Sequence, residues 1–281
     1  MKIRIVLADT DEKYINHFIR AFKIYYFNEV DIVTFSDLTA LKKYISSRAY
    51  DILLSVASLL PKEAEGKGMI LTSEMGIKEI NGRPAICKYQ KIENLYKGIL
   101  DAIAEQKSGI TYSYETSKES PVIAFTSAAG GVGKTTAALV YTRQLVKKGF
   151  QVMYLSLESF SNIDYFLNAE GSSNFSNVLF AVKCGKGNLQ MKIESSLKQT
   201  YGGVYFFSKP MNPNEIDELD QSEWKEFLDA VRAMGKFHCI VIDLPCANED
   251  TAKKIMPLSD RVLFITDGSD TTTEKTQTLM T

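Results

Sequence analysis

The sequence predicts an α/β protein with two doubly wound parallel-sheet domains. Short apolar runs of strand length alternate with stretches of helical periodicity along the chain, as in a parallel sheet covered by helices. The length of 281 residues suits two domains better than one. Residues 108–120 are polar, Ser/Thr-rich and without an apolar period, which is typical of a linker. We therefore expect one domain at residues 1–107 and another at residues 121–281.

The first domain is predicted to alternate strands with helices. Tyr14, Phe18 and Phe22 recur with helical spacing after the first strand, and similar patterns follow the second strand and the last. Because strands and helices alternate, the strands are expected to pair in parallel. The predicted strands are IRIVLA (3–8), DIVTF (31–35), DILLSV (51–56), MILTS (69–73) and PAICKY (84–89).

The second domain is predicted to alternate strands and helices in the same way. A helix over residues 136–148 ends at Gly149, and residues 159–203 carry a weaker pattern of mostly helix and loop. Ser222 is predicted to cap a later helix, in which Trp224, the only tryptophan, is expected to anchor the core. The predicted strands are VIAFTS (122–127), QVMYLSL (151–157), GVYFFSK (203–209), FHCIVID (237–243) and RVLFIT (261–266).

The composition excludes several classes of function. Lys and Arg number 33 against 34 Asp and Glu, so no overall positive field attracts nucleic acid or an anionic membrane. The four cysteines are scattered, without a C-x-x-C pair or zinc-ligand spacing. The first residues run straight into a strand pattern without the long apolar run of a signal peptide, and no apolar stretch reaches the length of a membrane span, so neither export nor a membrane span is expected. A cytoplasmic protein with no nucleic-acid partner is expected.

The segment SAAGGVGKTT at residues 127–136 nearly spells a phosphate-binding loop, or P-loop. The common pattern G-x-x-x-x-G-K-[ST] has a glycine at position 128, where this chain has Ala128. This replacement costs little unless the backbone there needs a positive φ. Because a strand precedes the loop and a helix follows it, its N–H groups are expected to surround an anion. Lys134 is expected to reach the β- and γ-phosphates of a nucleotide, and Thr135 to ligate Mg²⁺.

GGVGKTT, the strand before Glu158 and the strand end Asp243-Leu244-Pro245 together resemble the deviant P-loop ATPases of the MinD and ParA family, over residues 121–281. The resemblance implies ATP and Mg²⁺ as cofactors, with Asp243 holding the metal through water. That family carries a signature lysine at the position of Ala129, which reaches the partner's phosphates in a dimer. Its members continue beyond the position of Thr281, so the domain is expected to be C-terminally incomplete. The residues expected to bind nucleotide are Ala129, Gly130, Gly131, Val132, Gly133, Lys134, Thr135 and Thr136.

The departures from that family pattern predict that ATP binding survives better than hydrolysis. Where the family's second strand ends in D-x-D, this chain has Ser156-Leu157-Glu158, and Glu158 keeps only the charge of the carboxylate that positions the attacking water. Phosphoryl transfer needs positive charge at the γ-phosphate and an oriented water, and losing an arginine-finger-like cation costs about 10³–10⁵ in rate. Weak ATPase activity at most is expected, with Glu158 as the candidate catalytic residue.

The first domain is similar to a response-regulator receiver of the CheY-like fold. Asp9 follows the first strand, Thr72 or Ser73 the fourth and Lys88 the fifth, as in that family. Ser55-Val56-Ala57 stands where the phosphate-accepting aspartate belongs. A pseudo-receiver that docks a partner or dimerises is therefore expected, with Asp9 and Lys88 paired as a structural remnant.

The two domains in this order, without the signature lysine, resemble the TadZ/CpaE proteins of tight-adherence (Flp-type) pilus systems. The resemblance implies a homodimer that works as a localisation and assembly scaffold with other components of the pilus secretion machinery, at the cell pole. Direct contact with a membrane stays open.

Three other functions stay open at this point. An active partitioning ATPase would want a lysine at position 129 and a basic surface. A [4Fe–4S] protein of the nitrogenase iron-protein branch would need two cysteines per subunit at the dimer axis, and the candidate partner for Cys246 is Cys184, 62 residues earlier in a loop-like segment. A response regulator with an ATPase output would need the missing acceptor aspartate.

Overall fold

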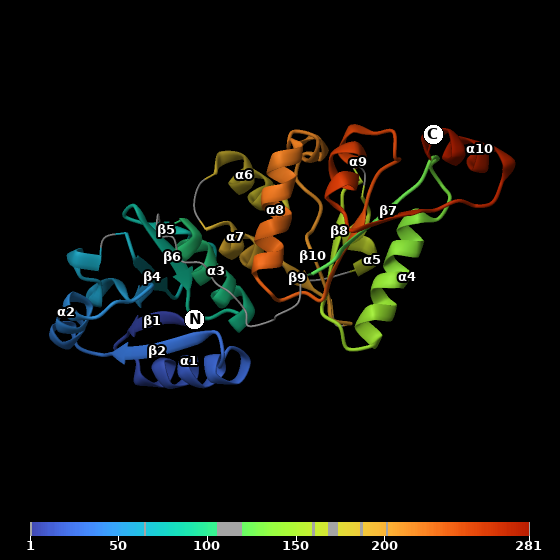
Figure 1. Cartoon of the computed structure of the whole chain (residues 1–281). Helices are drawn as coiled ribbons and strands as arrows, with labels where there is room; N and C mark the ends of the chain where they lie inside the picture. Colours follow the sequence, from blue (N-terminus) through green and yellow to red (C-terminus); the bar gives the residue numbers. More distant parts are fainter. Residues whose placement is uncertain are drawn as a thin grey trace. The chain divides into compact units, whose positions relative to one another are not determined.

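The computed structural model describes residues 2–64, 66–105, 120–158, 161–167, 174–185, 188–200 and 202–280. It divides into two compact units, Met1–Ile110 and Thr111–Thr281, called the first and the second domain below. Within the described residues each domain has one six-stranded sheet, parallel except for a short strand at one edge (Figure 1). The predicted fold class of two doubly wound α/β domains is confirmed. The predicted linker at residues 108–120 lies outside the described residues apart from Ser120.

The first sheet has the strand order β2-β1-β3-β4-β6-β5. Helix α1 begins where Asp11 accepts hydrogen bonds from the backbone of Lys13 and Tyr14, and it buries Ile15, Phe18 and Phe22 at helical spacing. The strands are β1 (Ile3–Ala8), β2 (Val30–Phe35), β3 (Ile52–Ser55), β4 (Gly68–Thr72), β5 (Glu79–Ile80) and β6 (Arg83–Cys87). The helices are α1 (Glu12–Tyr25), α2 (Leu38–Ser47) and α3 (Ile92–Glu105), with the short 3₁₀ turns η1 (Ala57–Leu59) and η2 (Lys62–Ala64).

Strand β5 is an element that the apolar pattern did not predict. It pairs antiparallel with β6 through Glu79 and Ile80, so Asn81 and Gly82 form a two-residue hairpin turn. Both turn residues have positive φ, 52° and 75°, as a type I′ turn requires. The Asn-Gly dipeptide is the sequence signal that could have found this hairpin, because few other residues accept these backbone angles.

The second sheet has the strand order β12-β7-β11-β8-β10-β9. Its central strands β7, β8 and β11 are almost entirely apolar and buried. The strands are β7 (Val122–Thr126), β8 (Val152–Ser156), β9 (Lys198–Gln199), β10 (Val204–Phe206), β11 (Cys239–Asp243) and β12 (Arg261–Phe264). The helices are α4 (Lys134–Lys147), α5 (Ile163–Leu167), α6 (Ser176–Cys184), α7 (Leu189–Ser196), α8 (Gln221–Ala233), α9 (Asp250–Ile255) and α10 (Asp270–Met280), with the 3₁₀ turns η3 (Pro213–Ile216) and η4 (Met256–Leu258).

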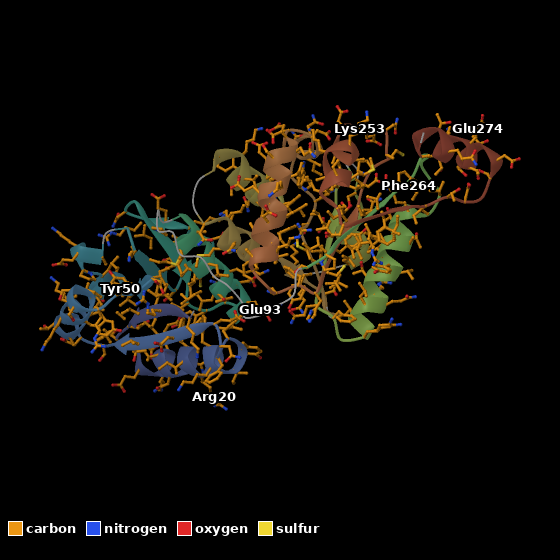
Figure 2. All side chains as sticks on the ribbon, viewed as in Figure 1. Arg20, Tyr50, Glu93, Lys253, Phe264 and Glu274 are labelled. Atoms are coloured by element: carbon orange, nitrogen blue, oxygen red, sulfur yellow. The ribbon has the colours of Figure 1, made fainter. Side chains whose placement is uncertain are left out.

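Helices cover both faces of the second sheet. Alternate residues of one strand enter opposite cores: Met153 packs with the apolar side chains of α6, α7 and α8, whereas Tyr154 packs with those of α4 and α5. Side chains fill the space between the sheet and its helices (Figure 2). Since β7, β11 and β8 run parallel in adjacent positions, Asp243 at the end of β11 lies level with Phe125 and Ser156. The carboxyl ends of three buried strands thus meet at one edge.

Helix α8 confirms one prediction and corrects another. Trp224 is fully buried and belongs to the core, as expected. The cap, however, is Asp220 and not Ser222: the Asp220 side chain accepts from the backbone of Glu223, whose carboxylate accepts from the backbone of Asp220. Ser222 lies inside the first turn and donates to Asp220 at 2.6 Å. The sequence offers both residues as caps, and the capping box with Glu223 selects Asp220.

Within the described part of the chain, no helix is both long and apolar enough to cross a membrane.

Candidate functional site

The P-loop connects the end of β7 to the start of α4. Gly133 caps the helix with a left-handed backbone, φ 87°, and Gly131 is also left-handed, φ 78°. Ala128 is not: Asn81 is the one non-glycine residue of the described ranges with positive φ. The backbone at position 128 therefore does not adopt the positive φ that would make alanine costly there.

The loop is open toward solvent on its glycine side. A Cβ placed on Gly130, Gly131 or Gly133 would meet no atom within 4 Å. Gly130, Gly131, Gly133 and Thr136 are exposed, and Ala129, Val132 and Thr135 are half-buried. Such a glycine rim at a helix N-terminus leaves room for an anion to approach the backbone closely.

Hydrogen bonds from side chains and backbone hold the first residues of the P-loop in place. The Ser127 hydroxyl donates to the carbonyl oxygen of Ala129 at 2.7 Å, and the Thr126 hydroxyl donates to that of Pro245 at 2.8 Å. The backbone N–H of Ala247 donates to the carbonyl oxygen of Ser127 at 2.9 Å. The P-loop is thus tied to the segment that follows β11.

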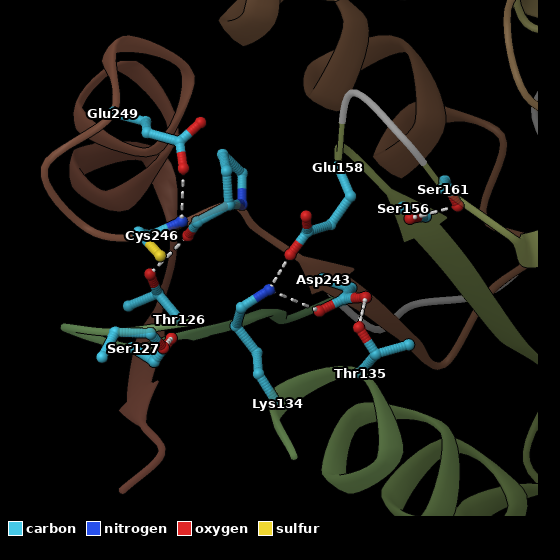
Figure 3. Close-up of polar contacts among 12 residues, drawn as sticks. Thr126, Ser127, Lys134, Thr135, Ser156, Glu158, Ser161, Asp243, Cys246 and Glu249 are labelled. Carbon is cyan, nitrogen blue, oxygen red and sulfur yellow. Dashed lines mark hydrogen bonds and ion pairs between the residues drawn. The ribbon is translucent and has the colours of Figure 1, made fainter. Parts of the chain in front are cut away.

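Lys134, the first residue of α4, lies between two carboxylates (Figure 3). Its Nζ pairs with Glu158 Oε1, which follows β8, and lies 3.5 Å from Asp243 Oδ1. The Lys134 side chain is 7% exposed, Asp243 is fully buried and Glu158 is 36% exposed. Burial alone would lower the pKa of Lys134, but Asp243 and Glu158 outweigh it and hold that pKa above its usual value. The lysine is therefore charged and already partnered.

Asp243 contacts three of the other side chains of the site, Lys134, Thr135 and Tyr154. Its Oδ2 accepts hydrogen bonds from Thr135 Oγ1 at 2.7 Å and from the Tyr154 hydroxyl at 3.0 Å. Burial raises the pKa of the Asp243 carboxyl above its usual value, against the opposing effects of Lys134 and of these two hydrogen bonds. Burial also raises the pKa of Tyr154, as does the nearby Asp243, so the tyrosine keeps its proton and donates.

The structure brings Lys134, Thr135, Glu158 and Asp243 together, and adds Tyr154, which sequence reasoning missed. A tyrosine in the apolar strand β8 was a usable signal, because a buried tyrosine hydroxyl usually finds a partner. Ser156, at the position of the first carboxylate of the resembled pattern, instead donates to the hydroxyl of Ser161 at 2.9 Å.

The donor set fits Mg²⁺ with a nucleotide. Among the described residues no group of three or more His, Cys, Asp or Glu side chains could hold a metal ion by itself. Mg²⁺ does not need such a group, because it usually takes one or two protein oxygens together with water and substrate phosphates. Thr135 and Asp243 supply oxygens of that kind beside the open glycine rim.

The corresponding edge of the first sheet holds an ion pair. Lys88 Nζ lies 2.8 Å from Asp9 Oδ2, with side-chain exposures of 9% and 2%, so the predicted pairing is confirmed. Ser55, at the end of β3, donates its hydroxyl to the carbonyl oxygen of Val56 at 2.9 Å. Lys88 also lies 4.8 Å from the centre of the Tyr14 ring. The lysine is thus satisfied by the domain itself.

Two family models match the chain: a TadZ-like receiver domain over residues 1–104, and an AAA domain over residues 120–281. No curated protein matches it.

Similar solved structures include three from bacteria and archaea. A ParA family ATPase from Chlorobium tepidum TLS is 16% identical, with a TM-score of 0.47, over 57% of this chain and 65% of that chain. The MinC:MinD cell division protein complex of Aquifex aeolicus is 20% identical, with a TM-score of 0.47, over 57% and 62%. The septum site-determining protein MinD of Pyrococcus horikoshii OT3, complexed with Mg-ADP, is 19% identical, with a TM-score of 0.46, over 56% and 61%.

The chain therefore spans less than two thirds of the length of each of these solved chains. The second family model covers more than half of the sequence, and the P-loop lies inside it. The chain therefore belongs to the AAA-domain family of that model, and its residues 1–104 match the model of a TadZ-like receiver domain.

Proposed function

We propose that the second domain binds ATP with Mg²⁺ at residues 129–136, and that the bound form dimerises as a localisation and assembly scaffold with weak or no hydrolysis. The role resembles that of TadZ/CpaE in Flp pilus secretion, in the cytoplasm at the cell pole. The observation that carries the proposal is the network of Lys134, Thr135 and Asp243 beside the glycine rim, with alanine at position 129. The first domain, whose Lys88 is paired with Asp9, serves for docking or dimerisation.

Binding follows from groups that the loop supplies without help from a second chain. Backbone N–H groups at the start of α4 and the charge of Lys134 attract the phosphates. Thr135 would ligate Mg²⁺ and Asp243 would hold it through water, and the ion would neutralise charge at the phosphates. Each of these residues lies within one connected set of hydrogen bonds.

Hydrolysis is disfavoured because the groups that act on the γ-phosphate are missing or occupied. Ala129 offers no cation to a partner's nucleotide, where positive charge stabilises the transition state. Glu158 pairs with Lys134 and is the candidate for positioning the attacking water. The Glu158 carboxylate must therefore separate from Lys134 before Glu158 can orient the attacking water.

Steady-state phosphate release should be slow for the natural protein and at least about tenfold faster for Ala129→Lys, because the lysine restores a cation across the dimer. Isothermal calorimetry should show ATP binding in both, and light scattering should show ATP-dependent dimers. The matched control is Ala128→Lys, which adds the same charge one residue away. Turnover of the natural protein as fast as that of Ala129→Lys would contradict the scaffold role, and failure to bind ATP would contradict the site.

Glu158→Gln should tighten ATP binding by about two- to fivefold, the scale of a partly exposed ion pair, because the competing carboxylate is removed from Lys134. The same variant should lower any residual turnover, since an amide positions water less well as a base. Calorimetry and phosphate release measure the two effects. Glu249→Gln is the matched control: Glu249 accepts from the backbone of Cys246 and lies apart from the Lys134 contacts in Figure 3. Weaker ATP binding by Glu158→Gln would show that Glu158 does not compete with the phosphates.

A further inference from the structure

Tyr154 reaches the site from the sheet and not from the P-loop. It lies in β8 opposite Val241 of β11, and Asp243 stands two residues further on the same face of the sheet. Its ring packs in the core beneath α4 with Ala138 and Leu139. From there its hydroxyl meets Asp243 Oδ2 at 3.0 Å. A fully buried side chain thus ends in one polar contact at the edge of the site.

The two oxygens of Asp243 have different partners. Oδ1 faces the Lys134 ammonium at 3.5 Å, whereas Oδ2 accepts from both Thr135 and Tyr154. In the proposed complex Lys134 would contact the phosphates and Thr135 would ligate the metal. Both residues would therefore have a role in ligand binding besides their contact with Asp243. Tyr154 has no task besides Asp243, and its rigid ring is fixed by packing.

We infer that Tyr154 is a positioning residue, which holds the Asp243 carboxylate at Oδ2 so that its other oxygen is presented to the water on Mg²⁺. The inference rests on the proposed function of the second domain. Partners that orient a metal-binding carboxylate from behind typically account for 10- to 100-fold in metal affinity. The hydroxyl therefore contributes to the gain in nucleotide affinity that Mg²⁺ produces, and little to nucleotide affinity without metal.

The test is a titration of a fluorescent ATP analogue with excess Mg²⁺ and with EDTA, in the full chain. The measured quantity is the Mg²⁺ gain, defined as Kd in EDTA divided by Kd in Mg²⁺. Tyr154→Phe should lower this gain by about tenfold and leave Kd in EDTA within about twofold. Tyr141→Phe is the matched control, since Tyr141 of α4 packs on Phe125 in the same core. It should keep the gain of the natural protein.

A double-mutant cycle then shows whether Tyr154 acts through Asp243. In an Asp243→Asn background, Tyr154→Phe should change the Mg²⁺ gain no further. Trp224 fluorescence during thermal unfolding reports whether each variant is folded.

The possible results distinguish a failure of the proposed ATP site from a failure of the positioning role of Tyr154. No binding by the natural protein would overturn the nucleotide site itself. Binding with an Mg²⁺ gain that Tyr154→Phe leaves unchanged would overturn the positioning role alone. Equal weakening by Tyr154→Phe with and without Mg²⁺ would also overturn it, because a purely structural defect gives that result.

Discussion

Replacing Lys134 with methionine is expected to lower the free energy of unfolding of the second domain by about 3–5 kcal/mol. The change leaves the fully buried Asp243 without its cation, with hydrogen bonds from Thr135 and Tyr154 alone. Uncompensated buried charge is among the costliest defects in a folded protein. Urea unfolding followed by Trp224 fluorescence measures the loss, because the only tryptophan lies in the core of this domain.

The controls isolate the charge. Adding Asp243→Asn to Lys134→Met should restore most of the stability, because no buried carboxylate is then left unpaired. Lys147→Met, at the exposed end of the same helix, should change stability by less than about 0.5 kcal/mol. If Lys134→Met matched Lys147→Met, the Lys134–Asp243 contact would not contribute to folding. Loss of ATP binding in a Lys134 variant can therefore be interpreted only if the stability of that variant is measured as well.

The first domain is expected to respond in the same way to Lys88→Met. This change leaves Asp9 buried without its ammonium partner and removes the cation that lies over the Tyr14 ring. The expected loss is about 3–5 kcal/mol of unfolding free energy for this domain. Far-UV circular dichroism should show a part of the urea transition move to lower concentration, while the Trp224 transition stays in place as an internal reference.

Two comparisons decide this second prediction. Lys88→Met with Asp9→Asn should recover most of the lost stability, whereas the exposed Lys43→Met should leave both transitions unmoved. Coincident shifts of both transitions would show that the ion pair does not stabilise the first domain on its own. Unchanged transitions would show that the pair is energetically neutral.

Local pattern was enough to predict most of the fold. The strands of both domains have apolar runs bounded by turn residues, and α4 follows a glycine loop and ends two residues before Gly149, whose φ is 88°. The capping residue of α8 was predicted wrongly because Asp220 and Ser222 are both good caps. Their choice depends on which one meets Glu223. Strand β5 was missed because two residues are too short to show a period.

The candidate site was predictable as a set of positions and not as a set of contacts. The P-loop spacing places Lys134 and Thr135 at a helix N-terminus, and D-x-P places Asp243 at a strand end. That Glu158 pairs with Lys134 depends on the course of the chain after β8. That Tyr154 meets Asp243 depends on the register of β8 against β11, which no local pattern encodes.

Each sheet of the described chain closes one edge with an antiparallel strand of two residues, β5 beside β6 and β9 beside β10. An exposed strand edge presents unpaired backbone groups to which another chain can hydrogen-bond. A very short antiparallel strand at the edge reduces this pairing. Among the described strands the opposite edges are β2 and β12, neither of which has a short antiparallel strand beside it, so at β2 and β12 the described sheets lack this protection against addition of a foreign strand.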